Sequence, residues 1–322
     1  MRHWLAHWGI VIAFAASCAG QTRAPEIWHL PSAIDHEDLL DGSGGTSGQP
    51  RGDFTFEKED MNGSSPKIVV RDRNHVKWTV KMGPEAQPET VASRFVWATG
   101  FFTREDYWMD RIQVQDMPAH LKRGGNLVHD GVIENVRLEH IPDGEKKMGG
   151  WKWHANPFTG TRELHGLAVL MAVINNWDLK DSNNSVYRDK AGSEYYAVSD
   201  LGASFGGNGE GLTDARSKGN LKTYETSKFI TKTTARYVDF ATPALPDPLD
   251  NLRLPQDAHE RLAMRSVTKH IPRADAKWIG SLLGQLSHQQ ICDAFRAGGY
   301  STPEAEAYAA IMEERIRRLR EL

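Results

Sequence analysis

The alternation of apolar and polar residues changes along the chain, and this change separates two predicted regions. In the first region, three short segments rich in β-branched and aromatic residues cover residues 54–57, 67–71 and 76–81. Gly, Ser, Pro or Asn separates them, and such runs are typical of strands joined by tight turns. The pattern predicts an antiparallel meander.

One helix and two further strands are expected after the meander. Residues 88–99 are predicted to be helical, because Pro88 is tolerated at the first position of a helix and Gly100 is typical of its end. Apolar residues then alternate with polar ones in two segments, which predicts two strands with Ile112 and Val114 inward in one, and Val136, Leu138 and His140 inward in the other.

From about Thr161 the apolar spacing becomes helical. One face of a core helix is predicted to carry Leu164, Leu167, Ala168, Met171 and Ile174. Residues 185–188 and 194–199 are expected to form a hairpin, and most of the remaining chain is predicted to be helical. The expected fold is therefore α+β, with a small β-rich lobe, a larger helical lobe and a ligand cleft between them.

The N-terminal residues have the composition of an export signal. Residues 1–20 combine Arg2, a short apolar run and small residues around Cys18, which resemble a bacterial lipobox. We expect export to the periplasm or attachment to a membrane through a lipidated Cys18; a frayed or buried N-terminal helix is the alternative. The expected division is a signal at 1–20, a flexible linker at 21–52, a nucleotide-binding lobe at 53–145 and a catalytic helical lobe at 146–322. The linker is expected because residues 41–52 are dense in Gly, Ser and Pro.

Composition excludes several classes of function. The 322 residues are 39% hydrophobic, which is enough for two lobes of ordinary size. The net charge of −3 comes without a basic stripe, so nucleic acid is not an expected partner. The two cysteines lie far apart and argue against a disulfide framework, and the histidines show no recognised metal-binding spacing.

Two polar motifs in the second region suit phosphoryl transfer, which needs positive charge on phosphates, oxygen ligands for Mg²⁺ and an acceptor for the attacking hydroxyl. The loop at residues 176–183 places Lys180 two residues and Asn183 five residues after Asp178. It resembles the kinase catalytic loop, in which the Asp aligns the hydroxyl, the Lys meets the phosphate and the Asn binds metal. Asp200-Leu201-Gly202 resembles the metal-binding Asp-Phe-Gly turn. Each motif alone also fits an ordinary polar turn.

The first region offers a matching phosphate site. Lys81 ends a predicted strand and Glu89 lies eight residues later in the next helix. In a kinase-like fold the strand lysine binds the α- and β-phosphates and the helix glutamate holds it. Glu85 is the alternative glutamate.

The segment at residues 63–67 resembles the G-x-x-P-K loop of the HipA family of bacterial Ser/Thr kinases, and PETVASRF resembles that family's segment after the strand lysine. The resemblance, to HipA-like and PI3/4-kinase-like bacterial phosphotransferases, covers residues 54–206; Lys180 stands where HipA proteins have His. It implies ATP- and Mg²⁺-dependent phosphorylation of a hydroxyl on a protein, sugar or lipid. The implied nucleotide-binding residues are Lys81, Glu89, Gly63, Ser64, Ser65 and Lys67, and the implied metal ligands are Asn183 and Asp200.

Two other functions stay open. ATP is scarce outside the cell, so an exported chain could be a pseudokinase-like binding lipoprotein. Residues 202–206 also match G-x-S-x-G, the nucleophile elbow of serine hydrolases, with Ser204 as nucleophile and His259 or His270 as base. That elbow needs a helix directly after it, and the glycine-rich residues 207–211 are poor helix formers.

Overall fold

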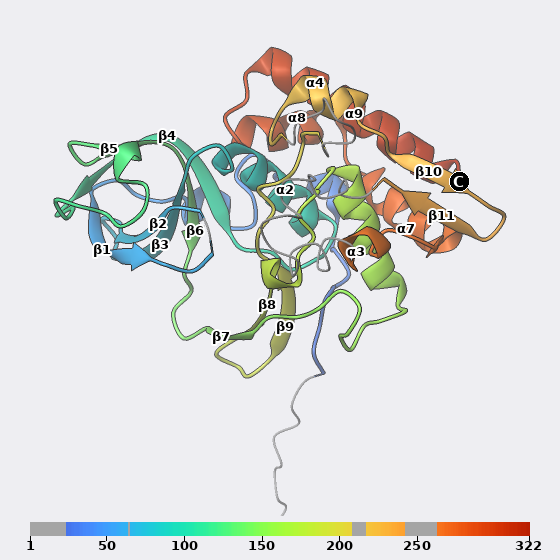
Figure 1. Cartoon of the computed structure of the whole chain (residues 1–322), viewed down its shortest axis with the longest axis horizontal. Helices are drawn as coiled ribbons and strands as arrows, with labels where there is room; N and C mark the ends of the chain where they lie inside the picture. The colour runs from blue at the N-terminus through green and yellow to red at the C-terminus, as the bar shows by residue number, and fades with distance from the viewer. Residues whose placement is uncertain (1–23, 64, 208–216, 242–262) are drawn as a thin grey trace, which may run out of the picture.

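The chain folds into a small lobe built on a curled β-sheet and a larger lobe built mainly from helices (Figure 1). The computed structural model describes residues 24–63, 65–207, 217–241 and 263–322. Within them, the predicted α+β fold with two lobes is confirmed.

The small lobe contains the predicted meander. Its elements are β1 (Phe54–Asp60), β2 (Lys67–Arg71), β3 (Lys77–Met82), α2 (Ala86–Ala98), β4 (Asp106–Gln115), η2 (Gly125–Leu127), β5 (Val128–His129) and β6 (Val132–His140). Strands β1, β2 and β3 pair antiparallel in sequence order. Strand β6 pairs with both β4 and β3, so the sheet closes on itself, which the apolar pattern alone did not predict.

Alternation along the strands gives this closed sheet an apolar interior. In β3, Trp78, Val80 and Met82 point inward, and Val136 and Leu138 of β6 meet them from the neighbouring strand. The intervening residues of both strands therefore lie on the outer face of the sheet, where Lys81 is found.

The larger lobe combines helices with two small sheets. Its elements are β7 (Lys146–Gly149), α3 (Arg162–Val173), η3 (Asp181–Asn183), β8 (Asn184–Arg188), β9 (Glu194–Val198), α4 (Leu221–Thr226), β10 (Ile230–Thr233), β11 (Tyr237–Phe240), β12 (Ile271–Pro272), α7 (Arg273–Leu283), α8 (His288–Ala297) and α9 (Thr302–Arg320). The predicted face of α3 is buried, and β8 and β9 form the predicted hairpin. A capping box of Ser287 and Gln290 starts α8.

Helix α2 lies between the two lobes (Figure 1). Val91, Phe95 and Val96 on one side of α2 belong to the core of the larger lobe, and α2 packs there against α8. The opposite side of α2 covers β4 and β6 of the closed sheet. The helix begins two residues before the predicted start, so Pro88 lies within its first turn, and Gly100 ends it with a φ of 87°.

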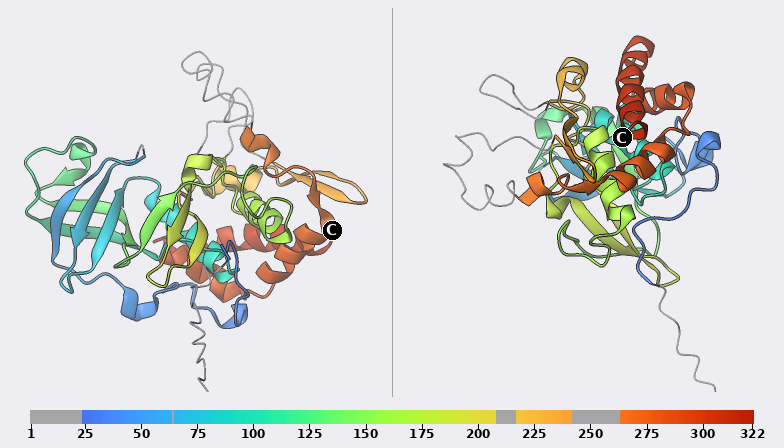
Figure 2. Two further views of the ribbon diagram at one scale, coloured as in Figure 1. Left: turned by 90° about the horizontal axis from the view of Figure 1, so that it is seen from below. Right: turned by 90° about the vertical axis from the view of Figure 1, so that its right-hand side faces the viewer.

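The segment before β1 is not the flexible linker that its composition predicted. It contains η1 (Ile34–His36) and α1 (Gly45–Gly48), and it runs along the outside of both lobes (Figure 2). Ile34 and Leu39 are buried in the larger lobe, and Gln290 donates hydrogen bonds to two carbonyl groups of the segment. Three of its glycines, Gly42, Gly44 and Gly48, lie in close contacts; a Cβ on Gly44 would lie 2.2 Å from the side chains of Glu105 and Tyr107.

The expected export signal at residues 1–20, with Cys18, lies outside the described residues and stays a prediction. No helix within the described ranges is long and apolar enough to cross a membrane.

Candidate active site

Lys81 lies at the centre of three carboxylates that come from different parts of the chain. Its Nζ atom is 2.5 Å from Oε2 of Glu85, 2.7 Å from Oε2 of Glu89 and 3.1 Å from Oδ1 of Asp200. The side chain of Lys81 is only 5% exposed. Burial by itself lowers the pKa of Lys81, but the three carboxylates raise it well above its ordinary value, so the ammonium stays charged.

Both candidate glutamates contact Lys81, so the two alternatives are not exclusive. Glu89 lies in the first turn of α2, and Glu85 is the residue that precedes the helix. Glu85 also accepts a hydrogen bond from Ser65 at 3.0 Å and pairs with Lys218. Although burial raises the pKa of Glu85, the neighbouring Lys81 and Lys218 hold it at about 2.

Arg137 pairs with the carboxylate of Glu89, and this role of Arg137 was not predicted from the sequence. In the β3–β6 register Lys81 pairs with Arg137, so these two side chains lie side by side on the outer face of the sheet. The carboxylate of Glu89 joins them, because its Oε1 lies 3.3 Å from Arg137 Nη1 and its Oε2 contacts Lys81. Arg137 is held in turn by Asp106 at 2.6 Å and by Glu139 at 3.0 Å. The alternation in β6 assigned Arg137 to the outer face, but only the fold shows that α2 covers this face.

The predicted catalytic loop brings its three polar residues together. Lys180 Nζ lies 2.9 Å from a carboxylate oxygen of Asp178, and the side-chain amide of Asn183 donates to Asp178 at 2.7 Å (backbone carbonyl) and 3.3 Å (Oδ2). Asn176 accepts a hydrogen bond from the backbone amide of Asp178 and so fixes the turn after α3. The loop thus holds the Asp178 carboxylate in a defined position.

The two metal-ligand candidates lie at adjoining ends of neighbouring strands. Asn183 precedes β8 and Asp200 follows β9, and the backbone amide of Ser199 donates to the carbonyl of Asn183 at 3.0 Å. The Asp200 side chain is 42% exposed, and the side-chain oxygen of Asn183 accepts no hydrogen bond from a described residue. Carboxylate and amide oxygens are the ligands that Mg²⁺ takes in proteins, so these residues fit a magnesium ion.

The three carboxylates around Lys81 also lie close enough together to bind one metal ion, since one oxygen of each lies within 4.8 Å of the others. The ammonium of Lys81 contacts all three and offsets part of their negative charge. Glu89 is buried and also bound by Arg137. Asp200 is the most exposed of the three and is thus the one available to a metal ion.

Gly202, the glycine of the Asp200 turn, is required by close packing. A Cβ at this position would lie 2.7 Å from the Cβ of Glu85. The turn that carries Asp200 therefore lies directly against the residue that precedes α2.

The predicted phosphate-binding loop connects β1 and β2. Gly63 has a φ of 67°, a left-handed conformation that favours glycine, and Ser65 contacts Glu85 as described above. Lys67 lies 3.9 Å from Asp60. Arg123 donates to the carbonyls of Asp60 and Gly63 and so ties this loop to the segment before β5, a contact that the sequence did not suggest. Ser64, also expected in the loop, lies outside the described residues.

A pocket of about 600 Å³ adjoins this face of the sheet. Its lining includes Val69 of β2, Thr79 of β3 and Ile141 directly after β6. Val69 pairs with Thr79 across the two strands, and Thr79 precedes Lys81 by two residues, so both lie on the face that carries Lys81. The volume is in the range of sites for small ligands.

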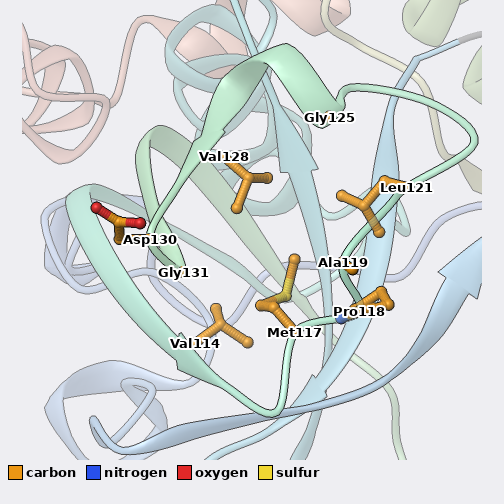
Figure 3. Close-up of a pocket in the computed structure, with 9 residues that line it drawn as sticks. All are labelled: Val114, Met117, Pro118, Ala119, Leu121, Gly125, Val128, Asp130 and Gly131. Carbon is orange, nitrogen blue, oxygen red and sulfur yellow. The ribbon is translucent and has the colours of Figure 1, made fainter.

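A second pocket, of about 460 Å³, lies between β4 and the segment at residues 117–131 (Figure 3). Figure 3 shows Met117 and Val128 pointing into this space. The lining contains no basic residue and one acidic residue, Asp130, so it offers no positive side chain to a phosphate group.

The alternative nucleophile Ser204 lacks the surroundings of a serine hydrolase. Its side chain is buried, and its hydroxyl forms no hydrogen bond with a described residue. The backbone amide of His270 binds Asp239 on the β10–β11 sheet, and His259 lies outside the described residues. The hydrolase interpretation is therefore not supported, because a buried hydroxyl reaches neither a base nor a substrate.

No family model and no curated protein sequence matches the chain. Among solved structures, the chain is similar to the Helicobacter pylori proinflammatory kinase CtkA, with 12% identity and a TM-score of 0.41 over 84% of this chain and 97% of that one. It is also similar to the golgi casein kinase, with 10% identity and a TM-score of 0.37 over 89% of this chain and 75% of that one.

The parts of the site follow one another along the chain in the order that the sequence predicted. A sheet supplies a lysine, the next helix supplies a glutamate, and the mainly helical lobe then supplies a polar loop and a hairpin that ends in an aspartate.

Proposed function

We propose that this chain is an ATP- and Mg²⁺-dependent phosphotransferase that acts on a hydroxyl group of a protein, sugar or lipid. The observation that carries the proposal is the contact of Lys81 with both Glu89 and Asp200. Asp200 lies 119 residues after Lys81 in the sequence, so the fold brings a buried cation to a half-exposed carboxylate across the two lobes. Binding of a nucleoside triphosphate with Mg²⁺ requires a fixed positive charge beside a carboxylate that can bind the metal ion.

The nucleotide would occupy the outer face of the closed sheet. The base would occupy the pocket lined by Val69, Thr79 and Ile141 together with charged residues of β1 and β3, and the phosphates would extend from there toward Lys81. Glu89 and Arg137 hold Lys81 in place, and the backbone of the loop around Gly63 would lie over the phosphates. Asn183 and Asp200 would hold the Mg²⁺ ion, which neutralises charge on the phosphates when it is bound.

The acceptor would approach the loop that carries Asp178. The Asp178 carboxylate orients the attacking hydroxyl and accepts its proton, and Lys180 places positive charge beside that carboxylate. Asn183 links the two halves of the site, because its amide binds Asp178 while its oxygen faces no described donor.

Glu85 favours a second candidate function, a nucleotide-regulated or non-catalytic binding protein. Its carboxylate contacts Lys81, Lys218 and Ser65 together, so it occupies part of the space beside Lys81. A phosphate group competes with Glu85 for the Lys81 ammonium. Nucleotide binding and phosphoryl transfer therefore need separate measurements.

The decisive experiment compares Asp200→Asn with wild type in two assays. A thermal shift with ATP and Mg²⁺ measures binding, and nucleotide at about one hundred times its Kd stabilises a protein by about 2.7 kcal/mol. Transfer of labelled γ-phosphate to the protein itself, or to protein, sugar and lipid hydroxyls, measures catalysis. We expect Asp200→Asn to lose the Mg²⁺-dependent part of the shift and all detectable transfer. Its fold should persist, because Lys81 keeps two carboxylate partners.

Ser204→Ala is the matched control, because the serine hydroxyl has no hydrogen-bond partner among the described residues and its loss should change neither assay. Thr79→Trp should fill the base pocket and remove the thermal shift without touching Lys81.

Transfer that persists in Asp200→Asn would refute the proposal. A nucleotide-dependent shift without transfer in wild type would favour the binding protein, and covalent labelling of Ser204 by a fluorophosphonate would favour the hydrolase.

A further inference from the structure

A second group of metal-ligating side chains lies in the larger lobe, between α8 and α9. His288 is the first residue of α8 and Cys292 lies four residues later, so both project from the same face of the helix. Glu306 and Glu313 are seven residues apart on α9 and face them. The ligand atoms of His288, Cys292 and Glu306 lie within 4.8 Å of one another.

The distances in this group suit a small tetrahedral site. Cys292 Sγ lies 3.5 Å from His288 Nε2. A zinc ion bound to one nitrogen and one sulfur at its usual bond lengths separates the two ligand atoms by about 3.6 Å. Glu306 Oε2 lies 2.8 Å from the same Nε2 and would move back to about 3.4 Å, the tetrahedral nitrogen–oxygen separation. This movement is small for a side chain that is 54% exposed.

Glu313 supplies the outer partner that metal-binding histidines commonly have. Its Oε1 lies 3.0 Å from His288 Nδ1. A carboxylate on Nδ1 keeps the hydrogen there and directs the lone pair of Nε2 toward the metal. The two carboxylates of α9 thus take different roles, with Glu306 beside the metal position and Glu313 behind the imidazole ring.

The thiol makes this group different from an ordinary ion pair of a histidine with glutamates. Cys292 is 3% exposed, yet its sulfur reaches the imidazole at the edge of the lobe rather than only the apolar core. Thiolate and imidazole together favour Zn²⁺, Co²⁺ and related ions over Mg²⁺. This preference separates the group chemically from the magnesium ligands proposed near Asp200.

We propose that His288, Cys292 and Glu306 bind one Zn²⁺-type ion, with Glu313 as the positioning residue and water in the fourth position. The ion would join the start of α8 to α9. Helix α2 packs against α8, so the site braces the helix that supports α2. The proposal does not depend on phosphotransferase activity.

Co²⁺ is the probe that tests this proposed metal site, because it binds at zinc sites and its visible absorption reports tetrahedral geometry. The full chain, stripped of metal with a chelator and kept reduced without oxygen, is titrated with Co²⁺. We expect one equivalent to bind with intense visible bands and a thiolate-to-cobalt charge-transfer band. Zn²⁺ should displace the cobalt, whereas a large excess of Mg²⁺ should not.

Variants assign the ligands. Cys292→Ser should lose the charge-transfer band, whereas Cys18→Ser should keep it. Glu306→Gln, at an exposed position that does not threaten the fold, should weaken Co²⁺ binding at least about tenfold, and Glu313→Gln should weaken it about ten- to a hundredfold. Glu314→Gln is the matched control, since Glu314 pairs with Arg317 on the same helix and should bind cobalt as wild type does.

Several outcomes would overturn the proposal. They are a wild-type chain without the charge-transfer band, a band that survives in Cys292→Ser, and an affinity that is the same in Glu306→Gln as in Glu314→Gln. Loss of the band in Cys18→Ser would assign the thiolate to the wrong cysteine and would also overturn it.

Discussion

Replacing Glu85 by glutamine tests the electrostatics of the Lys81 site most directly. The change keeps the size of the side chain and the acceptor for Ser65 but removes the charge that faces Lys81 and Lys218. The ordinary pKa of the Glu85 carboxyl is 4.5, and its pKa in the folded chain is about 2. At about 1.4 kcal/mol for each pH unit, this difference corresponds to about 3 kcal/mol of stability. Glu85 is 15% exposed, so solvent screens the interaction little.

The sign of the pH dependence follows from the lowered pKa. The unfolded chain binds a proton at Glu85 more readily than the folded chain does, so the contribution is fully present above about pH 4.5 and is lost as the pH falls through about 2. The free energy of unfolding of wild type should exceed that of Glu85→Gln by about 3 kcal/mol between pH 5 and 7. At pH 3 the difference should fall to about 1.4 kcal/mol.

Urea denaturation followed by circular dichroism at pH 7, 5 and 3 measures these differences. Glu134→Gln is the control, because Glu134 forms an exposed pair with Arg111 that is worth less than about 1 kcal/mol at any of these pH values. A Glu85→Gln chain as stable as Glu134→Gln at pH 7 would refute the reasoning. A difference that stayed constant between pH 5 and pH 3 would also refute it, because the effect would then not come from ionised Glu85.

Two other predictions concern the buried charges and the N-terminus. Arg137→Met should lower the free energy of unfolding by about 3–5 kcal/mol, because Glu89, Asp106 and Glu139 lose their shared cation. Arg111→Met, the exposed control, should lower it by less than about 1 kcal/mol, and urea denaturation at pH 7 measures both values. Cys18→Ser should move the protein from the membrane fraction to a soluble one, and a wild-type chain that is already soluble would argue against lipidation.

Local sequence patterns were sufficient to predict those parts of the site whose residues lie close together in the sequence. Strand alternation and helix signals placed Lys81 at a strand end and Glu89 in the next helix, and the fold brings both to Asp200. The Asp178 loop could be predicted for the same reason, because its side chains contact one another within a few residues of chain.

Contacts between distant segments could not be predicted in this way. Arg137 carries no local signal, since a charged residue on the outer face of a strand is normally solvated, and only the position of α2 makes it buried. The role of Glu85 depends on Lys218, 133 residues away. The segment before β1 was predicted to be flexible because glycine is common in linkers, whereas here Gly44 allows close contact with Tyr107.

The position of the Lys81 ammonium depends on the cores of both lobes. Lys81 is fixed to β3, whose inward side chains fill the closed sheet, and its partner Glu89 is fixed to α2, whose apolar side packs in the larger lobe. Buried charges join the two, because Glu89 contacts Lys81 and Arg137 while Asp106 of β4 contacts Arg137 and Arg94 of α2. A rotation of the sheet relative to α2 would separate these pairs and leave buried charges without partners, which is costly. The Lys81–Glu89 contact therefore holds only in one arrangement of the lobes, and that arrangement also places Asp200 beside Lys81.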